Sequence, residues 1–388
     1  MSDIDPERIY QHILKTQGEK HVLHSPEKME ACADYILEEF KSYGLNAGVH
    51  EFTVEGFDYT FRNIEASTHG EGPELLIVSH YDTVRHAPGA NDNGTAIAVM
   101  LEAARVISMS ESTEAIRFIS FNLEELNPFR VQQIEELALR HGISDETGQY
   151  TSWEISKIMD TFNALYTKFV IGSKFPKDAA MRAIDEMEKD LSESERTYLE
   201  GFAALTEGLS LENWPGKTAL MGSSAWVHDA DERGLSVKGV LCLETMGYTS
   251  SKKNSQHFPE GLTPDMFKIY ETEPDLITGD FLCVIGDHTS GPLAEAFCDQ
   301  CRRETVRLPY ACLQEDFNYE QAAYIMPDLL RSDHAPFWRE NIPALMLTDS
   351  ADFRYPYYHT HADTIDKLNF DFLAKICQAV VATALAFE

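Results

Sequence analysis

The sequence has no long apolar run and few basic residues. Nowhere do about 18 apolar residues follow one another, which excludes a helix that spans a membrane. Lysine and arginine number 32 against 64 aspartates and glutamates, so the formal net charge is -32. A surface of that sign repels phosphate backbones and anionic lipids, which excludes nucleic acids and membranes as partners.

Cysteines are also few, and the N-terminal segment does not resemble an export signal. The stretch MSDIDPERIYQHILK carries too many charges for a signal peptide. The seven cysteines are scattered and odd in number, so we expect reduced thiols in a cytoplasmic protein. Cys298 and Cys301 have CxxC spacing, but they lie in a helical pattern without a second such pair, which favours packing over a metal site.

Short apolar runs alternate with amphipathic segments along most of the chain. An alternating β-rich pattern spans Gly48 to Ser67, and a helical stripe follows from Gly94 to Met109. The apolar runs predict buried strands at ELLIVSH, AIRFISFN, VKGVLCLE, FLCVIG and IPALMLTD. Strands and helices in alternation predict an α/β fold, a three-layer sandwich around a mostly parallel mixed sheet.

One stretch, residues 129–220, interrupts this alternation. It contains no convincing strand, and segments such as WEISKIMDTFNALYTKFV and SERTYLEGFAALTEG carry helical periodicity. We therefore predict an all-helical subdomain inserted into an α/β core that consists of residues 1–128 and 221–388. The core alone retains an ordinary single-domain size.

Metal-binding residue types stand at the ends of the predicted strands. They are His80 and Asp82 in SHYDT, Asp92 in GANDNG, Glu124 and Glu125 in FNLEELN, Glu244 in LCLETMGY, and His359 in YYHTHADT. One such residue near a strand end is usually structural. Several at successive strand ends predict a site, because open α/β sheets place their sites at that edge.

The residue types suggest a division of labour. Zinc accepts imidazole nitrogen and carboxylate oxygen, and two zinc ions can share one carboxylate. Manganese or cobalt fits the same ligands. Of the adjacent Glu124 and Glu125, one can bind metal while the other acts as general base on a metal-activated water. Asp82 is placed to orient the imidazole of His80.

The motifs together resemble the co-catalytic zinc aminopeptidases, a family that includes bacterial leucyl aminopeptidases, aminopeptidase Y and the glutamate carboxypeptidase relatives. The motifs are HYDT, GANDNGTAIAVMLEAARV, the EE pair, MGSSAW, LETMGY, SDHAPFW and YHTHADTIDKLN. They cover most of residues 70–128 and 221–370, in the order in which the family has them.

The resemblance implies a role for each matching residue. Two zinc ions would be bridged by Asp92, with His80 and Glu244 completing one site and Glu125 and His359 the other. The general base would be Glu124, and Asp82 would support His80. Tyr358 stands where several relatives have a tyrosine that hydrogen-bonds the developing oxyanion. The resemblance also implies a cis peptide bond between Asp92 and Asn93.

The sequence departs from the family pattern in two places. Glu244 stands where most relatives have aspartate, so that site would hold its ion less tightly. The family also passes quickly from EE to the MGS segment, whereas residues 129–220 intervene here. Because this segment begins just after Glu125, we expect it to act as a lid over the site or as an arm through which copies of the chain assemble.

The implied function is that of a zinc-dependent exopeptidase, an aminopeptidase acting on short peptides or small aminoacyl amides. The alternative is an aminoacyl transferase of the glutaminyl-cyclase type, which shares the fold. A third possibility, a metal-free binding module, is disfavoured because every ligand position is filled. Asp333 and His334 in SDHAPF are expected to support the site, and Arg354 is expected either to meet substrate or to form a salt bridge.

Overall fold

The computed structural model describes residues 4–170, 173, 175–259, 262–263, 266–269, 275–314 and 316–387. The strands are β1 (Asn46–Val54), β2 (Phe57–Ser67), β3 (Glu74–His80), β4 (Ile116–Phe121), β5 (Val237–Glu244), β6 (Lys268–Ile269), β7 (Leu282–Gly286), β8 (Tyr310–Gln314) and β9 (Ala344–Thr348). The longer helices of the N-terminal half are α1 (Pro6–Thr16), α2 (Pro26–Ser42), α3 (Gly94–Ser108), α4 (Pro128–Arg140), α5 (Trp153–Val170), α6 (Pro176–Glu186) and α7 (Glu193–Leu205). The later helices are α8 (Met221–Glu232), α9 (Gly291–Arg302), α10 (Tyr319–Ile325), α11 (Ala335–Arg339) and α12 (Phe370–Ala384), with short 3-10 helices η2 (Pro327–Leu330), η3 (Ala351–Phe353) and η4 (Ile365–Lys367).

Within the described ranges, the strands form one mixed sheet in the order β1-β2-β4-β3-β5-β9-β7-β8-β6. The central strands β4, β3, β5 and β9 are parallel, whereas antiparallel pairings lie nearer both ends of the sheet. Each predicted strand is present, and this confirms the α/β fold class. The short strands β6 and β8 were not predicted, because neither carries an apolar run long enough to stand out.

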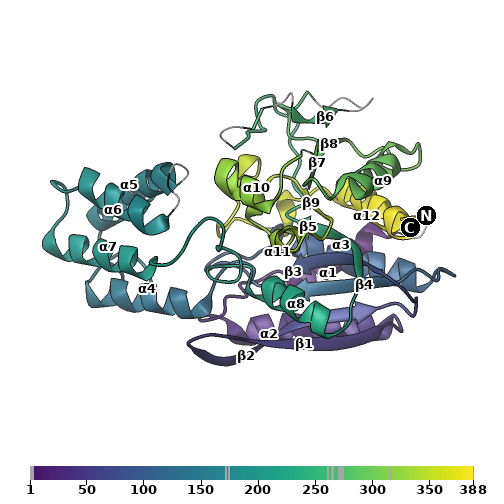
Figure 1. Ribbon diagram of the computed structural model, residues 1–388, viewed down its shortest axis with the longest axis horizontal. Coiled ribbons are helices and arrows are strands. Elements are labelled where there is room, and N and C mark those ends of the chain that lie inside the picture. The colour runs from purple at the N-terminus through teal and green to yellow at the C-terminus, as the bar shows by residue number, and fades with distance from the viewer. Residues whose placement is uncertain are drawn as a thin grey trace.

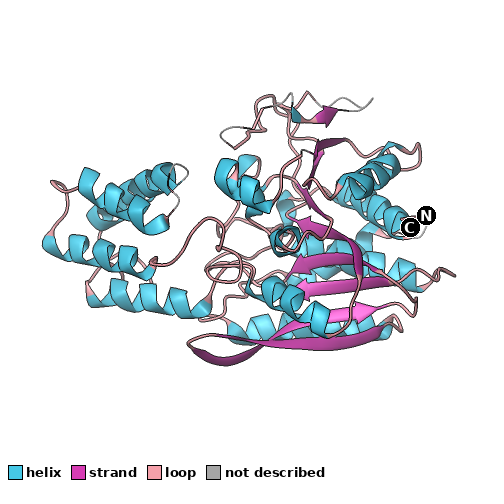
Figure 2. Cartoon of the chain, viewed as in Figure 1, coloured by secondary structure: helices cyan, strands magenta, loops and turns pink. Residues whose placement is uncertain are grey.

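Helices cover both faces of the sheet (Figures 1 and 2). Along β3, Leu75 and Ile77 enter one core while Leu76 and Val78 enter the other, so both faces are buried. The first core is closed by α1, α2, α3, α9 and α12, and the second by α8, α10 and α11. This is the predicted three-layer sandwich.

Helices α4 to α7 pack on one another around an apolar cluster of their own, which includes Phe162, Ile184 and Leu199. In Figure 1 they stand apart from the sheet, in blue to teal. A capping box at Ser192 begins α7, because its hydroxyl and the Glu195 carboxylate satisfy backbone N–H groups that the first turn leaves unpaired.

The two ends of this helical segment lie side by side. The Leu220 N–H donates to the Glu124 carbonyl at 2.8 Å, and the Asn127 N–H donates to the Thr218 carbonyl at 2.7 Å. The segment therefore leaves and re-enters the rest of the chain at one place, next to the Glu124–Glu125 pair.

All seven cysteines are buried thiols, including Cys298 and Cys301 within α9. That environment fits the packing role predicted for the CxxC pair. Among the residues that the structure describes, no helix is both long and apolar enough to cross a membrane.

Candidate active site

Three parallel strands bring most of the predicted ligands to one edge of the sheet. His80 is the last residue of β3, and Glu244 is the last of β5. Strand β4 ends at Phe121, and Leu123 then takes a left-handed conformation, with φ 56°. That turn brings the next two residues, Glu124 and Glu125, back toward β3.

The other two ligand candidates arrive on loops. Asp92 lies in the loop between β3 and α3 and is 3% exposed. The Asp92–Asn93 peptide bond is cis, as the resemblance implied. His359 lies in the long connection after β9, with φ 56°. Residues far apart in sequence thus meet at the carboxyl edge of the parallel strands.

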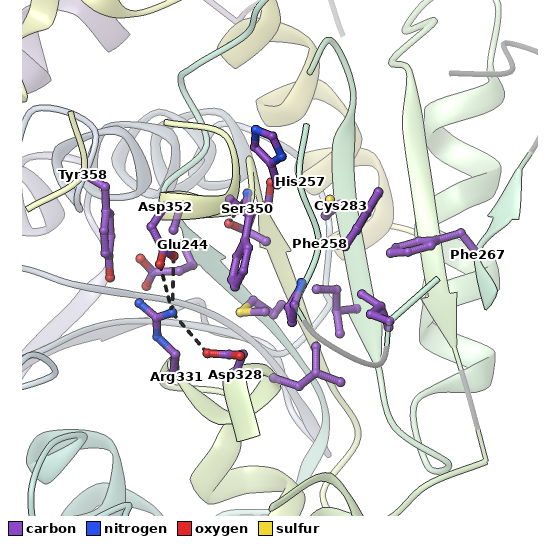
Figure 3. Close-up of a pocket in the computed structure, with 18 residues that line it drawn as sticks. Glu244, His257, Phe258, Phe267, Cys283, Asp328, Arg331, Ser350, Asp352 and Tyr358 are labelled. Carbon is purple, nitrogen blue, oxygen red and sulfur yellow. Dashed lines mark hydrogen bonds and ion pairs between the residues drawn. The ribbon is translucent and has the colours of Figure 1, made fainter. Parts of the chain in front are cut away.

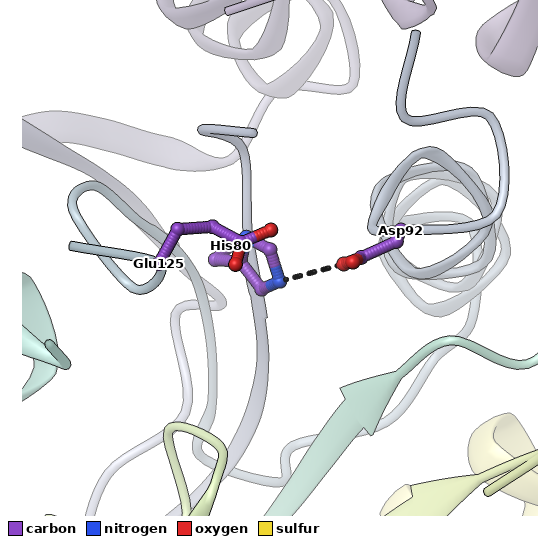
Figure 4. Close-up of side chains that lie close together, drawn as sticks. All are labelled: His80, Asp92 and Glu125. Atoms are coloured by element: carbon purple, nitrogen blue, oxygen red, sulfur yellow. Dashed lines mark ion pairs between the residues drawn. The ribbon is translucent and has the colours of Figure 1, made fainter. Parts of the chain in front are cut away.

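The carboxylate of Asp92 stands between two histidines. Its Oδ1 lies 3.4 Å from Nε2 of His80, and its Oδ2 lies 3.1 Å from Nε2 of His359. Figure 4 shows the first of these contacts, with Glu125 on the other side of His80. The Glu244 carboxylate lies 3.4 Å from His80 Nε2, and the Glu125 carboxylate lies 3.1 Å from His359 Nε2. Each oxygen of Asp92 therefore faces its own histidine–carboxylate pair.

The adjacent glutamates have different surroundings. Glu125 contacts His359, whereas Glu124 lies 3.9 Å from Nε2 of His80, on the side of Glu244. Among the residues that the structure describes, two sets of donor atoms are close enough to hold an ion. They are His80 with Asp92 and Glu125, and His80 with Glu124 and Glu244. Because Glu124 is farther from His80 than Asp92 or Glu244 is, it is the carboxylate of the cluster best placed to remain unbound.

The donor atoms fit metal ions. Nε2 of His80, Oδ2 of Asp92 and Oε1 of Glu125 are buried without a hydrogen-bond partner. Buried polar atoms are normally satisfied, so unpartnered atoms gathered in one cluster indicate a ligand there. Two imidazoles and three carboxylates form the nitrogen and oxygen set that zinc accepts.

The electrostatics of the metal-free chain support the same conclusion. Burial raises the pKa of Glu125 to about 7, and burial also raises the pKa of Glu124 well above its ordinary value. Burial opposes the charged form of His359, but Glu125 and Asp92 outweigh it and raise its pKa to about 11. Several carboxylates in one buried cluster favour a bound cation, and the raised pKa values mean that the same groups otherwise hold protons.

Asp82 holds the glutamate turn in place. It accepts the backbone N–H of Glu124 at 3.0 Å and that of Glu125 at 3.1 Å. Its Oδ1 also lies 3.4 Å from Nδ1 of His80. One carboxylate thus orients His80 and the backbone of both Glu124 and Glu125.

Three supporting residues were not singled out from the sequence. Ser332 and Asn93 donate to Oε2 of Glu244 at 2.8 and 3.3 Å. Asp363 accepts the backbone N–H groups of Asn91 and Asp92 at 2.8 and 3.1 Å. All three stand inside the quoted motifs, so motif position was the available signal, but their partners are defined by the fold.

The remaining predicted residues take supporting places. Asp333 and His334 are buried, and Nε2 of His334 donates to the Leu329 carbonyl at 2.7 Å. Arg354 is buried and donates to Gln256 and to the Phe281 carbonyl, both at 2.6 Å, so it does not face the ligand cluster. Its expected contact with substrate is therefore not supported, because its guanidinium is engaged in holding loops together.

A pocket opens beside Glu244 and Tyr358 (Figure 3). Its wall is largely apolar, formed by Phe258, Pro259, Leu262, Phe267, Cys283, Ile285, Leu329 and Met346. The charged side chains of Asp328, Arg331 and Asp352 lie at the end near Glu244 and Tyr358. The ring of Tyr358 stacks on His359, with centroids 3.8 Å apart.

Asp363 offers a test of how the bridging carboxylate is held. Asp363→Asn places an amide donor against backbone N–H donors, so the loop that carries Asp92 should shift. We expect zinc affinity to fall by about 10–100-fold, the range for residues that orient metal ligands. Competition with a chromogenic chelator measures it. Asp366→Asn, at an exposed position on η4, is the control, and equal affinities in the two variants would contradict the assignment.

Comparison with known proteins agrees with this geometry. The sequence matches the model of peptidase family M28 over residues 63–173 and 294–384, just over half of the chain. The chain belongs to peptidase family M28. The predicted family and its peptidase function are thereby confirmed. The first matched segment runs past Asn127 into α4 and α5.

Two curated relatives illustrate the family. The chain is 23% identical over 364 residues to the uncharacterized protein YfbL of Escherichia coli K12, covering 92% of this chain and 79% of that protein. It is 32% identical over 162 residues to aminopeptidase YwaD of Bacillus subtilis strain 168, covering 40% of this chain and 32% of that protein.

Two solved structures share the fold. A leucine aminopeptidase precursor from Bacteroides thetaiotaomicron has a TM-score of 0.57 at 11% identity, covering 100% of this chain and 98% of that one. The glutaminyl cyclase of Porphyromonas gingivalis has a TM-score of 0.55 at 12% identity, with 99% of both chains covered. Because hydrolase and cyclase have the same architecture, the choice between them depends on the site.

Proposed function

We propose that this M28 peptidase is a dinuclear zinc aminopeptidase that removes apolar residues from short peptides or small aminoacyl amides. The observation that carries the proposal is the position of Asp92, whose two oxygens face separate histidine–carboxylate pairs. A shared carboxylate between two ligand sets is the arrangement that two neighbouring ions require. A single ion would leave one of the two histidine–carboxylate pairs, His80 with Glu244 or His359 with Glu125, without a metal to bind.

The residues would divide as follows. His80, Asp92 and Glu244 would hold one ion, and Asp92, Glu125 and His359 the other. Manganese or cobalt fits the same donors. Zinc ions bound there supply Lewis-acid activation of water and of the substrate carbonyl.

The catalytic side chains of this chain would then move protons and stabilise charge. Glu124 takes a proton from the attacking water and passes it to the leaving amine. Its backbone is fixed by Asp82, so the carboxylate stays near His80. Tyr358, beside His359, donates its hydroxyl hydrogen to the oxygen on which negative charge develops.

The pocket beside Glu244 supports a preference for apolar side chains. Phe258, Phe267 and Met346 are among its lining residues, and burying an apolar side chain there is favourable by about 25 cal/mol per Å². A substrate whose scissile carbonyl lies at the ligand cluster would place its first side chain in this pocket. Leucine, methionine and phenylalanine should be accepted, and aspartate or lysine rejected.

The test is a panel of aminoacyl p-nitroanilides, assayed with zinc content measured on the same sample. Leucine, methionine and phenylalanine derivatives should be hydrolysed, whereas their N-acetylated forms should not, because an aminopeptidase cleaves next to a free amine. Cyclisation of an N-terminal glutamine without hydrolysis, at one zinc per chain, would favour the cyclase alternative.

We further propose that residues 129–220 form a lid or an assembly arm and contribute no catalytic group. Arg85, in the loop between the ligands His80 and Asp92, pairs with Glu135 of α4 at 3.4 Å and donates to the Thr147 carbonyl. The segment therefore contacts the ligand loop as well as the Glu124 turn. A helical segment in this position would admit dipeptides and exclude long chains. It would do so either by covering the site itself or by joining subunits that enclose the site between them.

Replacing residues 131–216 by a short Gly/Ser linker tests this role. Lys217 and Thr218 are retained because their carbonyls accept hydrogen bonds from Asn127. We expect a folded core with its metal intact and a raised kcat/KM for a decapeptide relative to a dipeptide, or fewer chains per particle in solution. If the ratio and the number of chains per particle are both unchanged, the segment is neither lid nor arm. Loss of all turnover in a metal-loaded core would reveal a catalytic residue within it.

A further inference from the structure

Arg331 stands at the mouth of the apolar pocket and joins two of its walls. It follows η2 and its Nη1 donates to Asp328 at 3.3 Å and to both oxygens of Asp352 at 3.3 and 3.4 Å. Asp328 belongs to η2 and Asp352 to η3, so one guanidinium bridges two short helices that are separate in sequence (Figure 3).

The same guanidinium approaches Tyr358. Its carbon lies 5.9 Å from the centroid of the Tyr358 ring, and Figure 3 shows the hydroxyl end of that ring directed toward Arg331. The other neighbour of the ring is His359, stacked at 3.8 Å. The three contacts to carboxylates all use Nη1, so they do not occupy the other terminal nitrogen of the guanidinium.

The contacts of Arg331 could hold the Tyr358 side chain in one position. An exposed ion pair contributes little to stability, and the Arg331 side chain is 38% exposed while that of Asp352 is 45% exposed. Contacts from two carboxylates on different short helices nevertheless limit where Nη1 of Arg331 can lie. Tyr358 otherwise carries its hydroxyl on a chain segment without helix or strand, where a small displacement would misdirect the hydrogen bond.

We propose that Arg331 is a positioning residue for the peptidase reaction, which fixes the Tyr358 hydroxyl beside the ligand cluster through its anchors Asp328 and Asp352. The inference rests on the proposed aminopeptidase function. Because the hydroxyl acts when charge develops on the substrate oxygen, Arg331 governs kcat rather than KM. If Arg331 instead contacted the substrate directly, its removal would raise KM.

A double-mutant cycle tests whether Arg331 acts through Tyr358. Tyr358→Phe should lower kcat by about 10²–10³, the cost of one oxyanion donor. Arg331→Met should lower kcat about tenfold or more with little change in KM, and Arg331→Lys should recover part of the loss. In the Tyr358→Phe background, Arg331→Met should have no further effect, because the group it positions is already absent.

The control is Arg339→Met, on α11, whose side chain is 33% exposed and pairs with Glu340 at 3.6 Å outside the pocket. It should leave kcat and KM unchanged. Additive losses of kcat in the double variant, or a raised KM with kcat intact, would overturn the proposal. Zinc content and thermal unfolding of each variant show that the ligand cluster and the fold are preserved.

Crystal structures of the wild type and Arg331→Met provide a readout that does not depend on turnover. The Tyr358 ring should leave its stacked position on His359 in the variant. An unmoved ring would overturn the proposal even if the wild type proves inactive on every aminoacyl substrate. In that case the proposed function fails separately, because it is judged by wild-type turnover alone.

Discussion

Replacing Asp92 by alanine is expected to remove both metal ions and abolish peptidase activity. The two oxygens of Asp92 contact the two histidines, Oδ1 lying 3.4 Å from His80 and Oδ2 lying 3.1 Å from His359. Without it, each proposed site keeps one histidine and one glutamate, which is too few protein ligands for zinc. The remaining carboxylates would also retain protons, and protonated ligands do not bind metal.

Elemental analysis of the purified variant measures the loss. We expect no stoichiometric zinc in Asp92→Ala, and no rise in its unfolding temperature on addition of zinc, whereas the wild type should be stabilised by the bound ions. Asp92→Asn, which preserves the volume of the side chain, separates loss of the ligand from loss of the fold. Two zinc ions per chain in either variant would contradict a bridging role for Asp92.

The Glu124–Glu125 pair gives the second large effect. Glu124→Gln keeps the shape of the side chain but cannot accept a proton, so kcat should fall by about 10²–10⁴ while zinc content stays the same. Glu125→Gln should instead lose zinc, because it removes a charged ligand that contacts His359 at 3.1 Å. Each variant is the matched control for the other, since they are neighbours and undergo the same chemical change.

Kinetics and metal analysis on the same preparations give a clear result for this pair. Low kcat with full zinc in Glu125→Gln, together with zinc loss in Glu124→Gln, would mean that the two roles are reversed. Reversed roles would agree with one feature of the site, since Glu124 lies close enough to His80 and Glu244 to share an ion with them. The longer distance of 3.9 Å from Glu124 to His80 is what favours the base role.

Local sequence patterns were sufficient to predict the architecture and the edge on which the site lies. Apolar runs such as ELLIVSH mark strands buried on both faces, and a histidine or carboxylate directly after such a run must lie at the carboxyl edge. His80 and Glu244 were located by that rule, and the turn motifs placed Asp92 and the glutamate pair. Hydrophobic periodicity is a local property, so chain order alone reveals it.

The distances and pairings within the site depend on tertiary structure. Which oxygen of Asp92 meets which histidine depends on the loop before α3, held by Asp363 from the far end of the chain. The apolar pocket combines Phe258, Cys283, Leu329 and Met346, whose separations in sequence carry no pattern. Arg331 meets Tyr358 because η2 and η3 pack at the same pocket mouth.

The sequence by itself thus determined the fold class, the candidate ligand residues and the edge of the sheet where they gather, because strand burial and residue type are local properties. Tertiary structure decided the position of Asp92 between two histidines, the different surroundings of Glu124 and Glu125, and the apolar pocket with Arg331 at its mouth. Each of these depends on contacts between segments distant in the chain, and such contacts are set by packing of the whole core rather than by the pattern of any one segment.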